Sequence, residues 1–228
     1  MWSKHKRLIV VAGAAVVTAA ILALTCGNFS TDPAARAAQP GDTKARLAAI
    51  DEIERSPPAK AASALAPLTT DADTHVSVRA IEALGRMRRP EAVEPVKAAL
   101  KDPRPETREA SVIALGRLRP RDAPETLVQA LRTDTAPEVR AAAATALGIN
   151  HTWDAMPDII RALEDDSYQV RAGAAMAIRR MWQRDYFYRP EDPPQKRAAS
   201  VARIRDAWEE FRHSPMYQAA KQPKEAKP

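Results

Sequence analysis

The sequence has few aromatic residues and a single cysteine, and both shortages limit what the chain can build. Phe, Trp and Tyr make up 5% of the 228 residues, whereas 45% are hydrophobic. Many of those are alanine, so bulky side chains for one large core are scarce. This composition favours helices that meet through many thin interfaces. With Cys26 as the one cysteine of the sequence, no internal disulfide can form.

Catalytic and metal-binding motifs are also missing. The four histidines are scattered along the chain and do not form a metal-ligand pattern. The sequence contains no nucleophile elbow, zinc-protease helix, paired CxxC motif or phosphate loop. It gives no support for an enzyme, and we predict a non-enzymatic protein without a cofactor or a bound metal. The net charge of +6 permits nucleic acid, an anionic membrane or an acidic protein as partner.

The longest apolar run stands near the start of the chain, behind a basic flank at residues 1–7. Residues 8–25 carry no charge and would extend roughly 27 Å as a helix, just short of the hydrocarbon core of a bilayer. A basic flank before such a run predicts a cytoplasmic N-terminus. We therefore expect a single-pass transmembrane helix in the inner (plasma) membrane, with everything after residue 26 in the periplasm or outside.

Two other interpretations of this segment stay open. A cleaved signal peptide has an apolar run of about 7–15 residues, which is shorter than this one, and the A-x-A sequence at 35–37 lies well past the run. Residues 24–27 resemble a bacterial lipoprotein box around Cys26, although Thr25 stands where Gly, Ala or Ser is usual. Processing of either kind would leave the protein secreted or lipid-anchored.

An internal repeat of 31 or 32 residues fills most of the remaining chain. The phrase EVRAAAATALG at 138–148 corresponds to similar phrases at 75–85, 106–116 and 169–179. Amphipathic segments of a second type alternate with these alanine-rich helices, at 91–102, 123–134 and 155–166. A weaker pair precedes them (45–56 and 59–71) and an altered pair ends the series (170–182 and 196–211).

This pattern predicts an all-α solenoid of about five helical hairpins over residues 43–212. A single hairpin cannot bury its apolar face, but a stack of hairpins can. The polar residues 26–42 are typical of a flexible linker, and the polar residues 213–228 are typical of a disordered tail.

Small residues recur at fixed places in the repeat. Alanine side chains would let neighbouring helix axes approach to the lower part of the usual range of about 8–10 Å. Gly85, Gly116 and Gly148 stand at the end of the alanine-rich phrase, and we expect each to end its helix in a left-handed conformation. Pro105 and Pro137 fit the first turn, where the missing N–H costs nothing.

An aspartate precedes an arginine by six residues in three repeats. The pairs are Asp102 with Arg108, Asp134 with Arg140, and Asp165 with Arg171. We predict a ladder of charge-assisted hydrogen bonds that joins successive loops. Ser77 takes the place of the arginine after Asp71, which predicts a weaker join at that end.

The D-x5-R spacing, the V-R-A-x-A-A-x-A-L-G phrase and the P-E-A-V start of the next helix together resemble HEAT repeats. More narrowly, they are similar to the short bacterial type also found in phycobilisome lyases. The resemblance covers roughly residues 43–212 and is most specific from 71 to 179. It implies a scaffold for protein–protein interaction, with the second helix of each pair lining the concave face. Exposed positions are expected there at Lys97, Lys101, Gln129, Arg132, Arg161 and Glu164.

The same resemblance leaves a second function open, namely an exported lyase-like or enzyme-accessory protein that binds a small ligand in the solenoid groove. A deep apolar pocket with convergent polar groups would favour the ligand. A shallow polar trough would favour a protein partner.

A row of arginines is the first candidate contact surface. The row follows the alanine-rich helices and includes Arg86, Arg88, Arg117 and Arg119. Cations at helix C-termini also match the helix dipoles, so the row has a structural explanation. As a functional surface it would engage an acidic protein or anionic lipid headgroups. Nucleic acid is disfavoured, because aromatic residues do not interleave with the arginines.

An aromatic insertion is the second candidate. Trp182, Tyr186, Phe187 and Tyr188 interrupt the repeat pattern before the final helix. Tyrosine, tryptophan and arginine are enriched at interface hot spots, so the insertion suits partner binding. Alternatively, it caps the open face of the last repeat.

Overall fold

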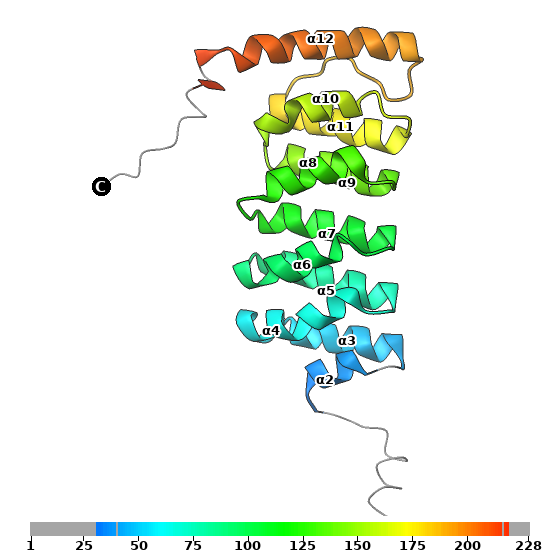
Figure 1. Cartoon of the computed structure of the whole chain (residues 1–228), viewed down its shortest axis with the longest axis vertical. Helices are drawn as coiled ribbons and strands as arrows, with labels where there is room; N and C mark the ends of the chain where they lie inside the picture. Colours follow the sequence, from blue (N-terminus) through cyan, green and yellow to red (C-terminus); the bar gives the residue numbers. More distant parts are fainter. Residues whose placement is uncertain (1–30, 40, 216, 219–228) are drawn as a thin grey trace, which may run out of the picture.

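The computed structural model describes residues 31–39, 41–215 and 217–218. This part of the chain is helical, without a strand, and its helices stack in one line with α2 (Pro33–Ala38) at one end and α12 (Pro194–Arg212) at the other (Figure 1). The first helices of the hairpins are α3 (Thr43–Ile53), α5 (Thr74–Met87), α7 (Pro105–Leu118), α9 (Pro137–Ile149) and α11 (Tyr168–Trp182). The second helices are α4 (Pro58–Leu65), α6 (Val93–Ala99), α8 (Ala123–Thr133), α10 (Met156–Ala162) and α12.

Each first helix packs on the first helix of the next repeat. Alanine is the commonest buried residue in this layer, and each central repeat adds a fully buried leucine, at Leu84, Leu115 and Leu147. Short 3-10 segments, η1 (Ala66–Thr70), η2 (Pro90–Ala92) and η3 (Trp153–Ala155), adjoin three of the second helices. The predicted all-α repeat solenoid is confirmed.

The recurring glycines do not end their helices, so that prediction is wrong. Gly85 and Gly148 lie inside α5 and α9, where the neighbouring helix leaves no room for a side chain. A Cβ on Gly85 would stand 2.8 Å from the Ala114 Cβ, and one on Gly148 would stand 2.5 Å from the Ala177 Cα. Glycine is therefore needed for close approach between helices, not for its left-handed backbone.

The left-handed residues come three positions after the glycines. Arg88 and Arg119, with φ of 51° and 52°, cap α5 and α7, and His151 follows α9 with φ of 51°. Although non-glycine residues seldom adopt this conformation, the cap closes each helix in the usual way. At α7, for example, the Arg119 N–H donates to the Leu115 carbonyl at 3.0 Å.

Arginines do join successive loops as predicted, but the predicted pairing of each arginine with the carboxylate six residues before it is wrong. Arg108 donates from Nε and Nη2 to both carboxylate oxygens of Asp134 at 2.8 Å each, and from Nη1 to the Asp102 carbonyl at 3.0 Å. Arg140 repeats the arrangement with the Asp165 carboxylate, at 3.0 and 2.9 Å. The hydrogen bond from Arg108 lowers the pKa of the Asp134 carboxyl. Arg108 and Arg140 thus bind the aspartate side chain of the following repeat and only the main chain of their own. Arg171 also binds the main chain of its own repeat, but its Nε donates to the Pro190 carbonyl at 3.1 Å instead of to an aspartate.

Other residues connect the loops near Ser77, which stands where the later repeats have the ladder arginine. Arg104 holds the Asp102 carboxylate through Nε at 2.8 Å and Nη2 at 2.7 Å, and its Nη1 reaches the Ala72 carbonyl at 3.0 Å. The buried Ser77 Oγ lies 3.2 Å from the Thr107 Oγ1. The missing arginine therefore does not leave this loop unattached.

Part of the segment predicted as a flexible linker, residues 26–42, is helical. Residues 33–38 form α2, and Asp32 caps its N-terminus, where Oδ1 accepts from the Ala34 N–H at 3.0 Å. Ala37 is fully buried, and its carbonyl accepts from Arg46 Nε at 2.9 Å. This segment therefore covers the first hairpin, and the linker prediction is wrong for it.

The predicted membrane segment at 8–25, its basic flank and residues 26–30 lie outside the described residues. Among the residues that the structure does describe, no helix combines the length and the apolar character needed to cross a membrane.

The predicted disordered tail is wrong at its start. Tyr217 is buried, its hydroxyl donates to Asp154 Oδ1 at 2.6 Å, and its ring centroid lies 5.4 Å from that of Trp208. The chain past α12 therefore folds back onto the last repeats. Residues 216 and 219–228 lie outside the described part.

Candidate functional site

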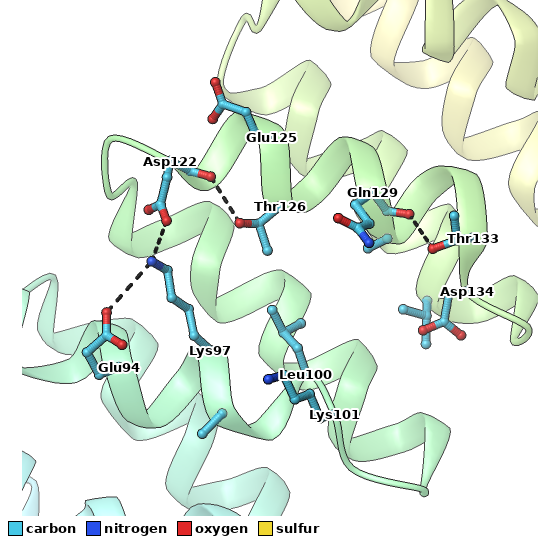
Figure 2. Close-up of a pocket in the computed structure, with 13 residues that line it drawn as sticks. Glu94, Lys97, Leu100, Lys101, Asp122, Glu125, Thr126, Gln129, Thr133 and Asp134 are labelled. Carbon is cyan, nitrogen blue, oxygen red and sulfur yellow. Dashed lines mark hydrogen bonds and ion pairs between the residues drawn. The ribbon is translucent and has the colours of Figure 1, made fainter.

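A groove with a volume of about 730 Å³ lies between α6 and α8, the second helices of two successive repeats (Figure 2). Its apolar lining comes from Ala98, Leu100, Ala130 and Val139. Its polar lining comes from Glu94, Lys97, Lys101, Asp122, Glu125, Thr126, Gln129, Thr133 and Asp134. The groove is thus an open trough in which charged and polar side chains surround a mostly apolar exposed surface.

The groove exists because α6 and α8 make few direct contacts. The α6 helix has seven residues and α8 has 11, and the small side chains Ala98 and Ala130 both line the space between them. The repeat that contains α8 is also one residue longer, since 32 positions separate Gly116 from Gly148 and 31 separate Gly85 from Gly116. The extra residue and the short α6 leave this seam unfilled.

One ionic contact crosses the groove. Lys97 on α6 pairs with the Asp122 carboxylate at the start of α8, and lies 3.7 Å from Glu94 on its own helix (Figure 2). This hydrogen bond raises the pKa of Lys97 and lowers that of Asp122. Both side chains reach solvent, so the pair fixes the geometry of one end more than it stabilises the fold.

Three other polar groups in the groove have no side-chain hydrogen bond or ion pair with any residue in the described part of the chain. They are Lys101, Glu125 and Gln129, and all three are exposed. Glu125 and Gln129 come from α8 and lie on one side of the groove, whereas Lys101, just after α6, lies on the other side (Figure 2). The groove therefore offers an anion and an amide on its α8 side and a cation on its α6 side.

A second groove, of about 450 Å³, lies between α8 and α10. Arg132 spans it with a bidentate contact to the largely buried Asp158, at 2.6 and 2.8 Å, and Arg161 lies 3.4 Å from the same carboxylate. Glu164 also lines this space. Here the charged groups are already paired, which distinguishes this seam from the one between α6 and α8.

In the described residues, no three His, Cys, Asp or Glu side chains gather in a way that could hold a metal ion.

A family model for HEAT repeats matches residues 31–116, 68–148 and 124–199, which together cover most of the sequence. The chain belongs to the HEAT-repeat family. Curated protein sequences gave no match.

Solved structures with a similar fold include other repeat proteins. The complex of CpcE and CpcF of phycocyanin lyase from a Nostoc species matches this HEAT-repeat chain with 25% identity and a TM-score of 0.53. The match covers 67% of this chain and 64% of that one, so less than two thirds of the lyase chain is matched. A designed armadillo repeat protein in complex with the peptide (KR)4 matches with 20% identity and a TM-score of 0.48, over 82% and 93% of the two chains.

The HEAT solenoid places the predicted second-helix positions in the two grooves. Lys97, Lys101 and Gln129 line the space between α6 and α8, and the other three line the space between α8 and α10. Sequence reasoning missed Asp122 and Glu125, which complete the first groove. The signal that could have pointed to them was the one-residue-longer repeat, which marks the irregular seam.

The predicted arginine row lies at one edge of the HEAT solenoid, away from the groove lining. Arg86 is bound to Glu54, with Nε 3.0 Å from Oε1. Arg88, Arg117 and Arg119 are exposed and form no side-chain hydrogen bond or ion pair within the residues described here. The structure thus divides the four predicted arginines into one structural residue and three available ones.

The predicted aromatic residues divide in the same way. Trp182 and Tyr186 join the cap on the last repeats, with ring centroids 5.1 Å apart, and Trp182 also lies 6.3 Å from Phe211. Tyr188 is buried and its hydroxyl donates to a main-chain carbonyl of the preceding repeat. Phe187 is 71% exposed, with φ of 54°. The insertion therefore caps the solenoid and leaves one of its four aromatic side chains largely in solvent.

Proposed function

We propose that this protein is a membrane-anchored, non-enzymatic HEAT-repeat scaffold on the extracytoplasmic side, and that it holds an extended segment of a partner protein in the groove between α6 and α8. The observation that carries the proposal is an open groove that contains three polar side chains without a partner in the described residues. The apolar run at residues 8–25 and its basic flank support both parts of this location, the anchor in the inner membrane and a solenoid in the periplasm or outside.

The dimensions of the groove suit a short peptide. A helix of 11 residues is about 16 Å long, which equals about five residues of extended chain. The Gln129 amide can both donate to and accept from a peptide main chain. Glu125 would favour a cationic side chain of the segment on the α8 side of the groove, and Lys101 an anionic one on the α6 side.

Binding of a small ligand is the second candidate, because the groove volume falls within the usual range of about 300–1,000 Å³ for ligand pockets. The structural similarity to a phycocyanin lyase chain also favours it. Against it stands how open the groove is to solvent, whereas ligand pockets bury most of the surface of their ligand. A protein segment therefore suits the groove better.

Site-specific photo-crosslinking in intact membranes tests the proposal. A photoreactive amino acid at Gln129 should capture a protein, whereas the same probe at the exposed Ala202 on α12 should not. The substitution Ala98→Trp, which fills the groove from the solvent side, should abolish capture at Gln129.

Capture that is equal at both positions, or that survives Ala98→Trp, would contradict the proposal. Retention of a small molecule by the purified full-length chain, lost in Ala98→Trp, would instead support the second candidate. Protease accessibility in intact spheroplasts tests the location, since a cytoplasmic solenoid would be protected.

A further inference from the structure

The C-terminal ends of the first helices lie side by side along one edge of the solenoid. The glycine contacts show this, because Gly85 meets Ala114 and Gly116 meets Ala146, and all four residues lie in the last turns of their helices. Neighbouring first helices are therefore parallel and in register. Residues that follow equivalent positions in α5, α7, α9 and α11 consequently form rows along this edge.

Exposed arginines without partners gather on this edge, here called the arginine edge. Its members are Arg88 after α5, Arg117, Arg119 and Arg121 at the end of α7, and Arg179 and Arg180 in the last turn of α11. None has a side-chain hydrogen bond or ion pair with another residue in the described ranges. At the opposite edge the arginines are committed, since Arg108 and Arg140 each bind an aspartate and a carbonyl.

The carboxylates nearest the arginine edge do not neutralise it. Glu91 pairs with Arg89 at 3.6 Å, and Asp122 pairs with Lys97 across the groove. The helix dipole favours cations in the last turn, but the effect falls off beyond it, and Arg121 lies past the left-handed cap at Arg119. The edge therefore keeps a local excess of positive charge.

The row is interrupted once, at α9. Ile149 occupies the position that Arg117 holds in α7 and Arg180 in α11, and its side chain is 42% exposed. An exposed apolar side chain thus stands between two basic clusters. With repeats about 10 Å apart, the clusters at α7 and α11 are separated by about 20 Å, the length of about six extended residues.

We propose that the arginine edge binds an acidic segment of a partner protein in which an apolar residue stands between two acidic stretches. The apolar residue contacts Ile149, and the acidic stretches pair with the arginines on either side. This surface is separate from the groove, so a failure of one proposal leaves the other standing.

A protein segment fits this edge better than a bilayer surface. Glu91 and Asp122 stand close to Arg89 and Arg121 in the sequence, and a flat layer of lipid phosphates would be pressed against these carboxylates as well. An extended chain can place its carboxylates opposite the arginines alone. It can also supply the apolar side chain for Ile149, which a headgroup layer lacks.

Fluorescence anisotropy with the full-length protein in a neutral detergent tests the proposal. The probe is a labelled peptide of sequence Glu-Glu-Ser-Leu-Ser-Glu-Glu, and the control peptide carries Ser in place of Leu. We expect Arg117→Glu and Arg180→Glu each to weaken binding of the probe about fivefold or more. The matched control is Lys44→Glu, an equal charge change at an exposed position on the opposite edge, and it should change binding less than twofold.

The substitution Ile149→Ser should remove the preference for the Leu peptide over the Ser peptide. A loss with Lys44→Glu as large as that with Arg117→Glu would show unspecific attraction and overturn the proposal. So would an unchanged affinity in both arginine variants, provided that their circular dichroism melting curves match the parent.

A separate measurement tests the membrane as occupant. A fluorophore on Arg121→Cys, in a chain with Cys26→Ser, is placed in anionic nanodiscs with nitroxide-labelled headgroups. Strong quenching would show that headgroups cover this edge, which would overturn the proposal. Absence of quenching, with the acidic peptide still bound, supports it.

Discussion

Gly148 on α9 lies so close to α11 that a Cβ at this position would stand 2.5 Å from both the Cα and the Cβ of Ala177. The close contact is therefore with the backbone of the neighbouring helix as well as its side chain. At Gly116 the corresponding Cβ would lie 2.9 Å from the Ala146 Cβ but 3.7 Å from its Cα. The two glycines occupy the same place in the repeat, yet they meet different atoms.

This difference predicts two outcomes for Gly→Ala substitutions. Helix propensity alone would make each alanine variant more stable by about 1 kcal/mol. We expect overpacking to outweigh this gain, so that each substitution destabilises the fold by about 1–3 kcal/mol. A second change, Ala146→Gly, should restore most of the stability lost in Gly116→Ala. The change Ala177→Gly should restore little in Gly148→Ala, because the Cα remains in the way.

Chemical unfolding of the parent, the four single variants and the two double variants measures these effects as two double-mutant cycles. If both glycine substitutions stabilised the protein, the helices would be further apart than described, and the interpretation of these glycines would fail.

The Arg108–Asp134 contact predicts a pH-dependent contribution to stability. The pKa of Asp134 is lowered in the fold, so its stabilisation is complete above the unfolded-state value of about 3.9 and is lost as the pH falls through the lower folded-state value. Asp134→Asn should cost about 2 kcal/mol at neutral pH and flatten the stability profile below pH of about 4.

Urea unfolding between neutral and acidic pH measures this dependence. The matched control is Glu209→Gln, which removes a half-exposed partner of Arg212 and should cost less than about 0.5 kcal/mol. Equal losses in the two variants would mean that the ladder contributes no more than an ordinary surface pair.

The buried Tyr217 predicts that the segment after α12 is part of the fold. Tyr217→Phe removes the hydrogen bond to Asp154 and should cost about 1 kcal/mol. Tyr217→Ala also removes the ring from the cluster with Trp208 and Phe211 and should cost about 3 kcal/mol. Thermal unfolding followed by circular dichroism measures both, with Gln218→Ala at an exposed neighbouring position as control. A silent Tyr217→Ala would restore the interpretation of this segment as a disordered tail.

The sequence predicted the repeat architecture well because repetition makes the same physical requirement visible several times. The alanine-rich phrase and the Asp–Arg spacing both recur, so the stack and its ladder could be inferred. Sequence spacing could not show which aspartate each arginine binds, because Arg108 and Asp134 are neighbours only once the hairpins stack.

The glycine prediction failed for a related reason. A glycine near a helix end fits two physical explanations, a left-handed cap or a close approach, and Gly116 alone cannot distinguish them. The candidate groove was equally hidden, because it results from an absence of packing between α6 and α8. The second-helix positions were named from the family resemblance, but the combination of Lys101, Glu125 and Gln129 required the structure.

The central claim is tested most directly by the affinity of this protein for the partner segment. That segment is the one identified by crosslinking at Gln129. Its binding to the full-length protein would be measured for the parent, for Ala98→Trp in the groove and for Ala202→Trp on the exposed surface of α12. We predict that Ala98→Trp weakens binding at least tenfold while Ala202→Trp leaves it unchanged. Equal affinity in all three proteins would show that the groove between α6 and α8 is not where the partner binds.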